Sequence, residues 1–162
     1  MVLKEISFEL PNRPGTLATV ARLLAGKHIN LAAISVDSTP SKGRVRLIVN
    51  DPVQAHHVLR AAGYEVEIRE MLVVGVEDRA GSLLQVLETL AREKINVQNV
   101  AILVAREGNR TLVAISVSNL PRARRILQKA GVVSESAERL VSNAGVTSAS
   151  PAIPSESVGL LL

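Results

Sequence analysis

The segments NRPGTL (residues 12–17) and DRAGSL (residues 78–83) are two versions of one short turn, 66 positions apart in the chain. The similarity continues through residues 12–34 and 78–100, and farther along the offset grows by two, so that residues 49–63 correspond to residues 117–131. The chain is therefore an internal duplication, and both copies are expected to fold alike. The identical pairs around the turn are Arg13 and Arg79, Gly15 and Gly81, Leu17 and Leu83, Val20 and Val86, Leu24 and Leu90, Ala25 and Ala91, Ile29 and Ile95, and Asn30 and Asn96.

The composition limits the classes of protein to consider. Of 162 residues, 47% are hydrophobic, yet Phe8 and Tyr64 are the only aromatic residues, so the core must consist of Val, Leu, Ile and Ala. The absence of cysteine excludes disulfides and thiolate metal sites. No apolar run approaches the roughly 20 residues of a membrane span, and the N-terminus lacks the apolar stretch of a signal peptide. We therefore expect a cytoplasmic protein that does not contact the membrane.

Each copy shows the order β-α-β-β-α-β. Residues 2–10 and 71–77 have the alternation of strands, and the next apolar residues recur at helical spacing. Two more strands follow in each copy, separated by the turn segments 39–43 and 106–109. A second helix begins after Asp51, a good N-cap, with Pro52 in its first turn.

This order predicts an α+β fold of two tandem ferredoxin-like units, each an antiparallel sheet with helices on one face. We place the first unit at residues 1–69 and the second at residues 70–136, with closing strands at 64–68 and 132–136. Residues 137–162 form a Ser-, Pro- and Ala-rich tail, in which SAERLVSNAG (136–145) has the pattern of one or two helical turns and the rest that of a linker. The pattern leaves open whether the final VGLLL (158–162) docks on a neighbour.

The repeated turn has the features of an anion site. Gly15 and Gly81 lie at helix N-termini, where unpaired backbone N–H groups and the helix dipole favour a carboxylate. Asn12 and Asp78 can accept a hydrogen bond from an ammonium group, and Asn30 and Asn96 begin the next strand with a side-chain amide. A molecule with one amine and one carboxylate is an amino acid. From the residues alone, a purely structural role as caps and turn formers is favoured over ligand binding.

The two segments ELPNRPGTLATVARLLAGKHINLAAISVDS (9–38) and GVEDRAGSLLQVLETLAREKINVQNVAILV (75–104) each resemble an ACT domain, and the resemblance covers residues 1–136. It implies a stand-alone pair of regulatory domains that sense amino acids, assemble into homodimers or larger oligomers, and hold the ligand where ACT units meet. The chain lacks an attached catalytic domain, so the resemblance also implies a separate metabolic enzyme as a partner. The ligand-binding positions that it implies are Asn12, Arg13, Pro14, Gly15, Thr16, Leu17 and Asn30 in the first copy, and Asp78, Arg79, Gly81, Ser82, Leu83 and Asn96 in the second.

Two departures from the family pattern bear on the ligand. Leu10 and Val76 stand where a serine-sensing subset of the family has a polar residue, which argues for a more apolar ligand or an unused site. Ala80 replaces the proline of the turn in the second copy. We therefore expect the first turn to be the better site.

Other functions fit the sequence less well. His56 and His57 are adjacent, and adjacent residues of a helix diverge by about 100°, so they make a poor metal pair. An RNA-binding sheet needs aromatic residues for stacking, and no Ser-His-Asp set or metal-ligand spacing is present. We predict a non-catalytic amino-acid-binding regulatory protein without metal, cofactor or nucleic acid. The alternative is a module that mediates oligomerisation or holds a partner enzyme without any small ligand.

Overall fold

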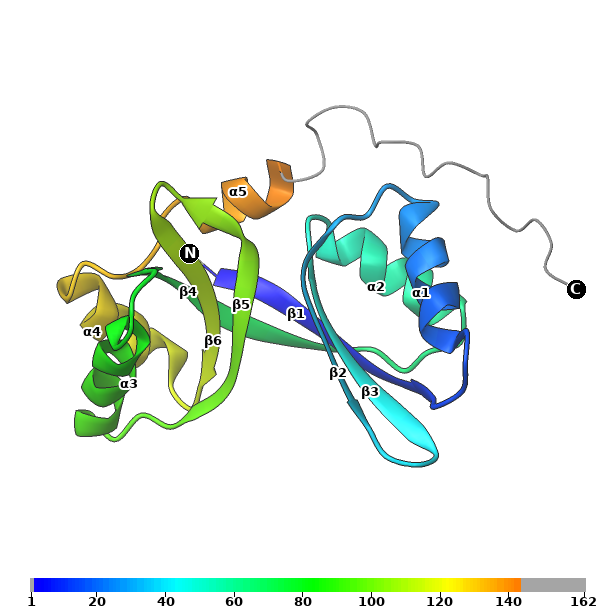
Figure 1. Ribbon diagram of the computed structural model, residues 1–162, viewed down its shortest axis with the longest axis horizontal. Helices are drawn as coiled ribbons and strands as arrows, with labels where there is room; N and C mark the ends of the chain where they lie inside the picture. Colours follow the sequence, from blue (N-terminus) through cyan, green and yellow to red (C-terminus); the bar gives the residue numbers. More distant parts are fainter. Residues whose placement is uncertain (1, 144–162) are drawn as a thin grey trace, which may run out of the picture.

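The computed structural model describes residues 2–143, which form one sheet with helices on both of its faces (Figure 1). The strands are β1 (Val2–Pro11), β2 (Leu31–Ser38), β3 (Lys42–Val49), β4 (Glu67–Glu77), β5 (Val97–Glu107) and β6 (Arg110–Val117). The helices are α1 (Thr16–Ala25), α2 (Pro52–Ala61), α3 (Ser82–Arg92), α4 (Leu120–Lys129) and α5 (Ala137–Asn143). The strand order is β2-β3-β1-β4-β6-β5, and every neighbouring pair is antiparallel.

The two copies form equivalent halves of this sheet, which confirms the predicted α+β fold. Helices α1 and α2 pack on the strands of the first copy, and α3 and α4 pack on those of the second (Figure 1). The alternation of the strands explains the packing, because Phe8 and Val45 face α1 and α2 while Val74 and Val113 face α3 and α4. Asp51 caps α2 as expected, since its side chain accepts a hydrogen bond from the N–H of Gln54 at 2.9 Å.

Strand β4 belongs to both copies. The closing strand expected at residues 64–68 begins only at Glu67 and continues without a break into the first strand of the second copy. The first half of β4 pairs with β1, from Ser7 opposite Glu67 to Val2 opposite Leu72, and the second half pairs with β6. The charged pair Arg69 and Glu70 separates the apolar runs in the sequence, but the strand passes through it.

The closing segment of the second copy is much shorter than its counterpart. Val133 forms an isolated antiparallel bridge with Val74. The N–H of Gly75 donates to the carbonyl of Val132 at 2.8 Å, and the N–H of Ser134 donates to Val73 at 3.0 Å. Residues 132–134 therefore occupy the edge of β4 beyond the end of β1.

The other face of the sheet, which we call the inner face, is partly covered by α5. Because the sheet curves, its two edge strands cover the rest of this face. The edge strands β2 and β5 lie at opposite ends of the strand order yet approach each other across this face. Ala137 and Val141 of α5 are buried in the inner-face core together with Leu3, Met71 and Leu112. The segment that we assigned to a tail from residue 137 thus begins with a packed helix. The linker and the VGLLL terminus predicted beyond it lie outside the described residues.

The two extra residues of the second copy lie in strand β5. The step from Ile102 to Arg106 covers four positions in β5, but it is matched by only two positions in β6, from Val113 to Thr111. This bulge has no equivalent in β2, whose ladder with β3 shifts only near its start, between Leu31 and Ala33. The bulge therefore accounts for the change of offset between the copies.

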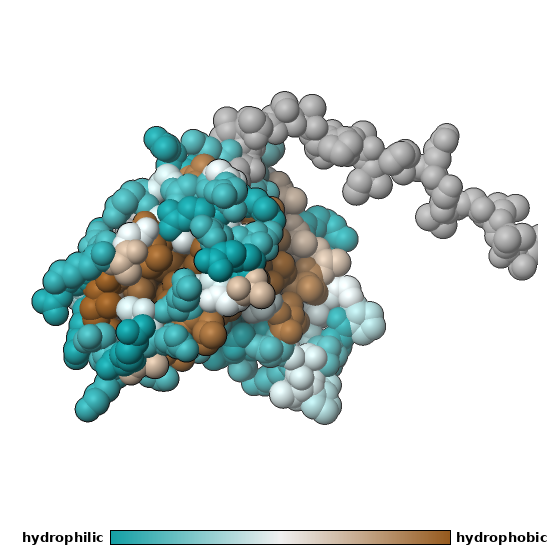
Figure 2. All heavy atoms as spheres, turned by 60° about the vertical axis from the view of Figure 1, so that its left-hand side comes forward, coloured by the Kyte–Doolittle hydropathy of each residue, from teal (hydrophilic) through white to brown (hydrophobic). Residues whose placement is uncertain are grey.

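Several apolar side chains of the edge strands remain exposed. Ile34 is 49% exposed on β2, while Ile102 and Val104 on β5 are 67% and 82% exposed. Figure 2 shows a face on which apolar residues form an extended area bordered by polar side chains. Within residues 2–143, no helix is both long and apolar enough to cross a membrane.

Candidate functional site

The two copies of the turn have the same backbone geometry. Gly15 and Gly81 have φ angles of 86° and 87°, in the left-handed region that glycine adopts without strain. Each turn is closed by the same two backbone hydrogen bonds. They join Arg13 N to Pro11 O (2.9 Å) and Thr16 N to Arg13 O (3.3 Å) in the first copy, and Arg79 N to Glu77 O (2.9 Å) and Ser82 N to Arg79 O (3.3 Å) in the second.

The helices that follow the two turns begin without a side-chain cap. Among residues 2–143, no side chain accepts a hydrogen bond from the first turn of α1 or α3. By contrast, Asp51 caps α2, and Asn119 caps α4 by accepting from the N–H of Arg122 at 3.1 Å. The N–H groups of Thr16 and Ser82 are bonded within the turns, so it is the following N–H groups of each first turn, with the positive end of the helix dipole, that remain available.

Two polar side chains of the first turn, those of Asn12 and Thr16, contact nearby backbone carbonyls. The side-chain amide of Asn12 donates to the carbonyl of Thr39 at 2.8 Å. The hydroxyl of Thr16 lies within hydrogen-bonding distance of two carbonyls, those of Pro11 at 2.9 Å and Arg13 at 2.8 Å. These contacts fix the turn against the β2–β3 hairpin.

The equivalent side chains of the second turn make different contacts. Asp78 forms an exposed ion pair with Arg106 at 3.2 Å, and Arg79 pairs with Glu77. Ser82 takes the place of Thr16 and is only 6% exposed, but its hydroxyl has no hydrogen-bond partner among residues 2–143. A buried hydroxyl without a partner costs free energy.

The two asparagines predicted for the site lie far from the turns of their own copies. Asn30 precedes β2, where its N–H donates to the side chain of Asn50 at 2.9 Å, whereas the turn of the first copy contacts Thr39 beyond the other end of β2. The eight residues of β2 separate the two positions by roughly 25 Å. Asn96 has the matching position before β5, where its N–H donates to the hydroxyl of Ser118 at 3.0 Å. One small ligand cannot contact a turn and the asparagine of the same unit.

A cavity of about 490 Å³ lies beside the second turn, between α3, the end of α4 and the end of β4. We call it the second-turn cavity. Two of the predicted residues, Arg79 and Ser82, line it, together with the polar side chains of Gln85 and Asn109. Its volume lies within the range of roughly 300–1,000 Å³ that is usual for small-molecule sites.

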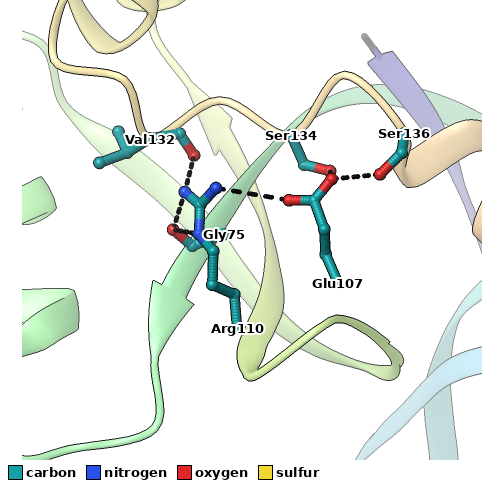
Figure 3. Close-up of polar contacts among 6 residues, drawn as sticks. All are labelled: Gly75, Glu107, Arg110, Val132, Ser134 and Ser136. Atoms are coloured by element: carbon teal, nitrogen blue, oxygen red, sulfur yellow. Dashed lines mark hydrogen bonds and ion pairs between the residues drawn. The ribbon is translucent and has the colours of Figure 1, made fainter.

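One wall of the second-turn cavity is the guanidinium group of Arg110, which the sequence did not single out (Figure 3). This group donates to the carbonyl of Gly75 from Nε at 3.1 Å and to the carbonyl of Val132 at 3.3 Å, and it pairs with Glu107 at 3.4 Å. A Cβ atom on residue 75 would come within 2.8 Å of the guanidinium. The absence of a side chain at Gly75 therefore allows Arg110 to lie there.

Glu107 links Arg110 to the closing segment of the second copy, residues 132–136. One of its carboxylate oxygens accepts hydrogen bonds from the hydroxyls of Ser134, at 3.2 Å, and Ser136 (Figure 3). The hydrogen bonds hold the chain that leads into α5 against the β5–β6 hairpin. Arg110 is thus held by the carbonyls of Gly75 and Val132 on one side and by the carboxylate of Glu107 on the other.

The first copy has a cavity of about 700 Å³ that shares part of this position, since Glu9, Pro11 and Tyr64 line it where Gly75, Glu77 and Val132 line the second-turn cavity. It is lined by β1, the end of α2 and residues 63–67, and it includes none of residues 12–17. The geometry therefore favours the second turn as a ligand site, although the sequence gave more weight to the first. Leu17 is 37% exposed, whereas its counterpart Leu83 is half-buried against the core of the second copy.

The remaining ionisable groups form no recognisable metal site. In the part of the chain that the structure describes, no three His, Asp or Glu side chains are placed to hold a metal ion. A third cavity of about 310 Å³ lies on the inner face between β2 and β5, and the buried Glu5 lines it. Neither asparagine and no residue of either turn borders this cavity.

Comparison with known structures identifies proteins of the same fold. Protein BT0572 from Bacteroides thetaiotaomicron is 28% identical, with a TM-score of 0.75 over 82% of this chain and 91% of that chain. The regulatory subunit of aspartate kinase from Thermus thermophilus, in its ligand-free form, is 21% identical, with a TM-score of 0.57 over 80% of this chain and 91% of that chain. The corresponding subunit from Thermus flavus is 20% identical, with a TM-score of 0.54 over 81% and 95% of the two chains. No curated protein matches the sequence.

The family assignment rests on the sequence of both copies. The model of the ACT domain matches residues 4–63 and again residues 71–131. These two matches cover most of the chain and coincide with the two halves of the sheet, separated within β4. The chain therefore belongs to the ACT domain family and carries two ACT domains in tandem.

Proposed function

We propose that this protein is a non-catalytic regulator that binds an amino acid through its duplicated turns. The observation that carries the proposal is that the helices following Gly15 and Gly81 begin without a side-chain cap. The other two long helices, α2 and α4, are capped by Asp51 and Asn119. Such a terminus binds a carboxylate through backbone N–H groups alone. Membership of the ACT family supports the regulatory role.

A site that uses both a turn and an asparagine needs a second ACT unit. The turn and Asn30 lie at opposite ends of β2, so only another unit can bring an equivalent asparagine to the turn. The exposed apolar side chains of β2 and β5 supply a surface for such pairing. We therefore propose a homodimer or larger assembly with ligand bound between ACT units, which in turn alters contacts with a metabolic enzyme.

The rival function is that of an assembly module without a ligand. The same exposed edge strands favour it, because they can mediate oligomerisation or hold a partner enzyme while the turns remain structural. The proteins of similar fold from Thermus are regulatory subunits of aspartate kinase, and a partner enzyme is part of both hypotheses.

A thermal-shift panel of the twenty amino acids separates the two functions. A ligand that binds only the folded state stabilises it by about 2.7 kcal/mol at a concentration of 100 times its Kd. The regulatory hypothesis predicts a rise in melting temperature with at least one amino acid. A flat panel at millimolar concentrations would overturn amino-acid binding and leave the assembly module.

Glycine substitutions then assign the response to the turns. Gly15→Ala and Gly81→Ala each place a side chain at a left-handed position beside the proposed carboxylate. Gly63→Ala is the matched control, because Gly63 has a φ of 91° and, as at the other two glycines, an added Cβ would lie in open space. We expect all three variants to lose similar stability, but only the turn variants to lose the ligand response. Loss of the response in Gly63→Ala alone would contradict the assignment.

A further inference from the structure

We propose that a cavity on the inner face of the sheet is a binding site for a primary ammonium group on a short aliphatic chain. This cavity of about 310 Å³, which we call the inner-face cavity, lies between the edge strands β2 and β5. Neither duplicated turn lines it, and neither Asn30 nor Asn96 does. The site is therefore separate from the turns, and it goes beyond the proposed function, which places the ligand at the turns.

The first argument is the buried carboxyl group of Glu5. This residue lies on β1, lines the inner-face cavity and is only 3% exposed. Its oxygen Oε2 accepts one hydrogen bond, from the side-chain amide of Asn99 at 2.5 Å. The other oxygen, Oε1, accepts no hydrogen bond from residues 2–143, yet it is not fully enclosed. A hydrogen-bond donor in the cavity can therefore reach it.

The second argument is that this carboxyl group has no cation beside it. Arg46 also lines the cavity, but its guanidinium forms an ion pair with Asp37. Within residues 2–143, no Lys, Arg or His side chain forms an ion pair with Glu5. Burial accordingly raises the pKa of Glu5, although Arg46, Arg69 and Asn99 act in the opposite direction. An ammonium group beside Oε1 would supply the missing charge and the missing donors.

The third argument comes from the second copy of the repeat, which has no such polar pair. The repeat and the strand ladders place Met71 where the first copy has Glu5, and Ala114 where it has Arg46. Both Met71 and Ala114 are fully buried in the apolar inner-face core. The fold therefore does not require charged residues at these two positions. A buried carboxyl group that the fold does not need is typical of a functional site.

The walls of the inner-face cavity fit a short aliphatic chain. Apart from Glu5, Arg46 and a serine, the side chains that line it are aliphatic, and they include Ile34 of β2, Ile48 of β3 and Ile102 of β5. Ile48 is buried, whereas Ile34 and Ile102 are largely exposed. The cavity thus opens to solvent between the two edge strands and ends at the carboxyl group. Its volume is at the lower end of the roughly 300–1,000 Å³ that is usual for ligand sites, so the chain must be short.

The experiment uses n-butylamine hydrochloride as the probe on the whole chain at neutral pH. Backbone amide signals are followed by NMR during a titration, with sodium butyrate and 1-pentanol titrated in parallel. We expect saturable shifts of the amides of Glu5, Ile34 and Ala101 with butylamine. Neither butyrate nor pentanol should cause them, because only the amine carries the positive charge that Glu5 lacks.

The binding of butylamine should strengthen as the pH rises. The ammonium group pairs with the ionised carboxylate, and in the free protein Glu5 keeps its proton above pH 4.5. The affinity should therefore increase from pH 4.5 through the raised pKa and then level off, while the amine stays protonated, since an alkylammonium such as that of lysine has a pKa of about 10.4. Arg46 and Arg69 are the charged groups that act on Glu5, whereas the charged side chains of α5, Glu138 and Arg139, are exposed.

Two pairs of variants test the assignment to this cavity. Glu5→Gln should weaken butylamine binding about tenfold or more and remove its pH dependence, because it removes the charged acceptor. Glu9→Gln is its matched control, since Glu9 lies on the same strand but is exposed and pairs with Lys42. Ala101→Leu fills the cavity, so it should abolish binding in a protein that still melts cooperatively. Ala105→Leu is its control, because Ala105 is also partly buried on β5 but does not line the cavity.

A lysine derivative distinguishes two sources of the ammonium group. N-acetyl-L-lysine methylamide carries the butylammonium chain on a peptide backbone. Tighter binding of this compound than of butylamine would assign the site to a lysine of a partner protein, and weaker binding would assign it to a free amine.

The proposal is overturned if butylamine causes no saturable shift, if butyrate or pentanol binds equally well, or if Glu5→Gln binds like the wild type. A flat amino-acid panel with intact butylamine binding would overturn only the proposed function, and the reverse result would overturn only the inner-face site. A response to lysine in that panel belongs to the inner-face cavity if Glu5→Gln abolishes it, and to the turns if Gly15→Ala or Gly81→Ala does.

Discussion

At the scale of single residues, Glu5 has the most unusual environment in the described part of the chain. It lies on the inner face and is 3% exposed, and the side-chain amide of Asn99 donates to its carboxylate at 2.5 Å. Burial raises the pKa of Glu5 above its ordinary value of 4.5, although Arg46, Arg69 and Asn99 act in the opposite direction. The charged form of this side chain is therefore disfavoured by folding.

This environment predicts a pH-dependent gain in stability for Glu5→Gln. In the folded state Glu5 holds its proton to higher pH than in the unfolded state, so the wild type loses stability as pH rises from 4.5 through the raised pKa. The variant lacks this loss and should gain in unfolding free energy relative to the wild type over that window. Urea unfolding at several pH values measures the difference.

Glu9→Gln on the same strand is the control, because Glu9 is exposed and pairs with Lys42 at the surface. A difference between wild type and Glu5→Gln that stays constant from acid to neutral pH would contradict the prediction.

The sequence predicted the residues of the turns but not those that complete the cavity. Gly15, Gly81 and the following helices were recognisable because their spacing repeats. Arg110 and Val132 were missed, since they approach the turn through the sheet and from the end of α4. The burial of Glu5 depends on curvature of the sheet and on β5, and neither is encoded in the alternation of β1.

At the scale of elements, α5 contributes to the core despite its length of seven residues. Its sequence favoured a helical turn or two, but no local pattern indicates which surface it covers. Val141 is 1% exposed and packs with the inner-face core, which includes Leu3, Met71 and Leu112. The helix thus protects an apolar surface that the four longer helices leave uncovered.

Removing part of this contact should destabilise the whole fold. Val141→Ala deletes two buried methyl groups, which should lower the free energy of unfolding by about 2 kcal/mol. Urea denaturation of the full-length chain measures the loss. Arg139→Ala is the control on the exposed side of the same helix. Equal stabilities of the two variants would show that α5 does not contribute to the stability of the core.

At the scale of the whole molecule, the exposed edges of the sheet predict self-association. Ile102 and Val104 lie beside the bulge of β5, and Ile34 lies on β2, all with about half or more of their surface exposed, at 67%, 82% and 49%. We expect a dimer or larger species at micromolar concentration. Replacing all three residues with lysine should shift the protein toward the monomer, because charge on an edge strand opposes pairing.

Light scattering measures this change in mass. Leu84→Lys is the control, since Leu84 is 56% exposed on α3, away from the strand edges. A monomeric wild type would contradict the prediction, as would dissociation caused equally by Leu84→Lys.

The repeat was sufficient to predict two equivalent units, but it did not predict that they share strand β4. The charged residues Arg69 and Glu70 have the appearance of a boundary between two apolar runs, whereas in the structure they are paired with Glu5 and Lys4 on β1. That pairing is a contact between units, so it depends on both copies being folded.

Strand β4 has a mechanical consequence for any signal that passes through the molecule. A strand shared by both halves of the sheet has no joint, so the two units cannot swing apart on a flexible hinge. A strain applied at one turn can reach the other through β4 and its ladder with β1, and also through the contact of β2 with β5 across the inner face. A change of twist along β4 is therefore expected to move β2 and β5 together, and these two strands carry the exposed apolar side chains Ile34, Ile102 and Val104.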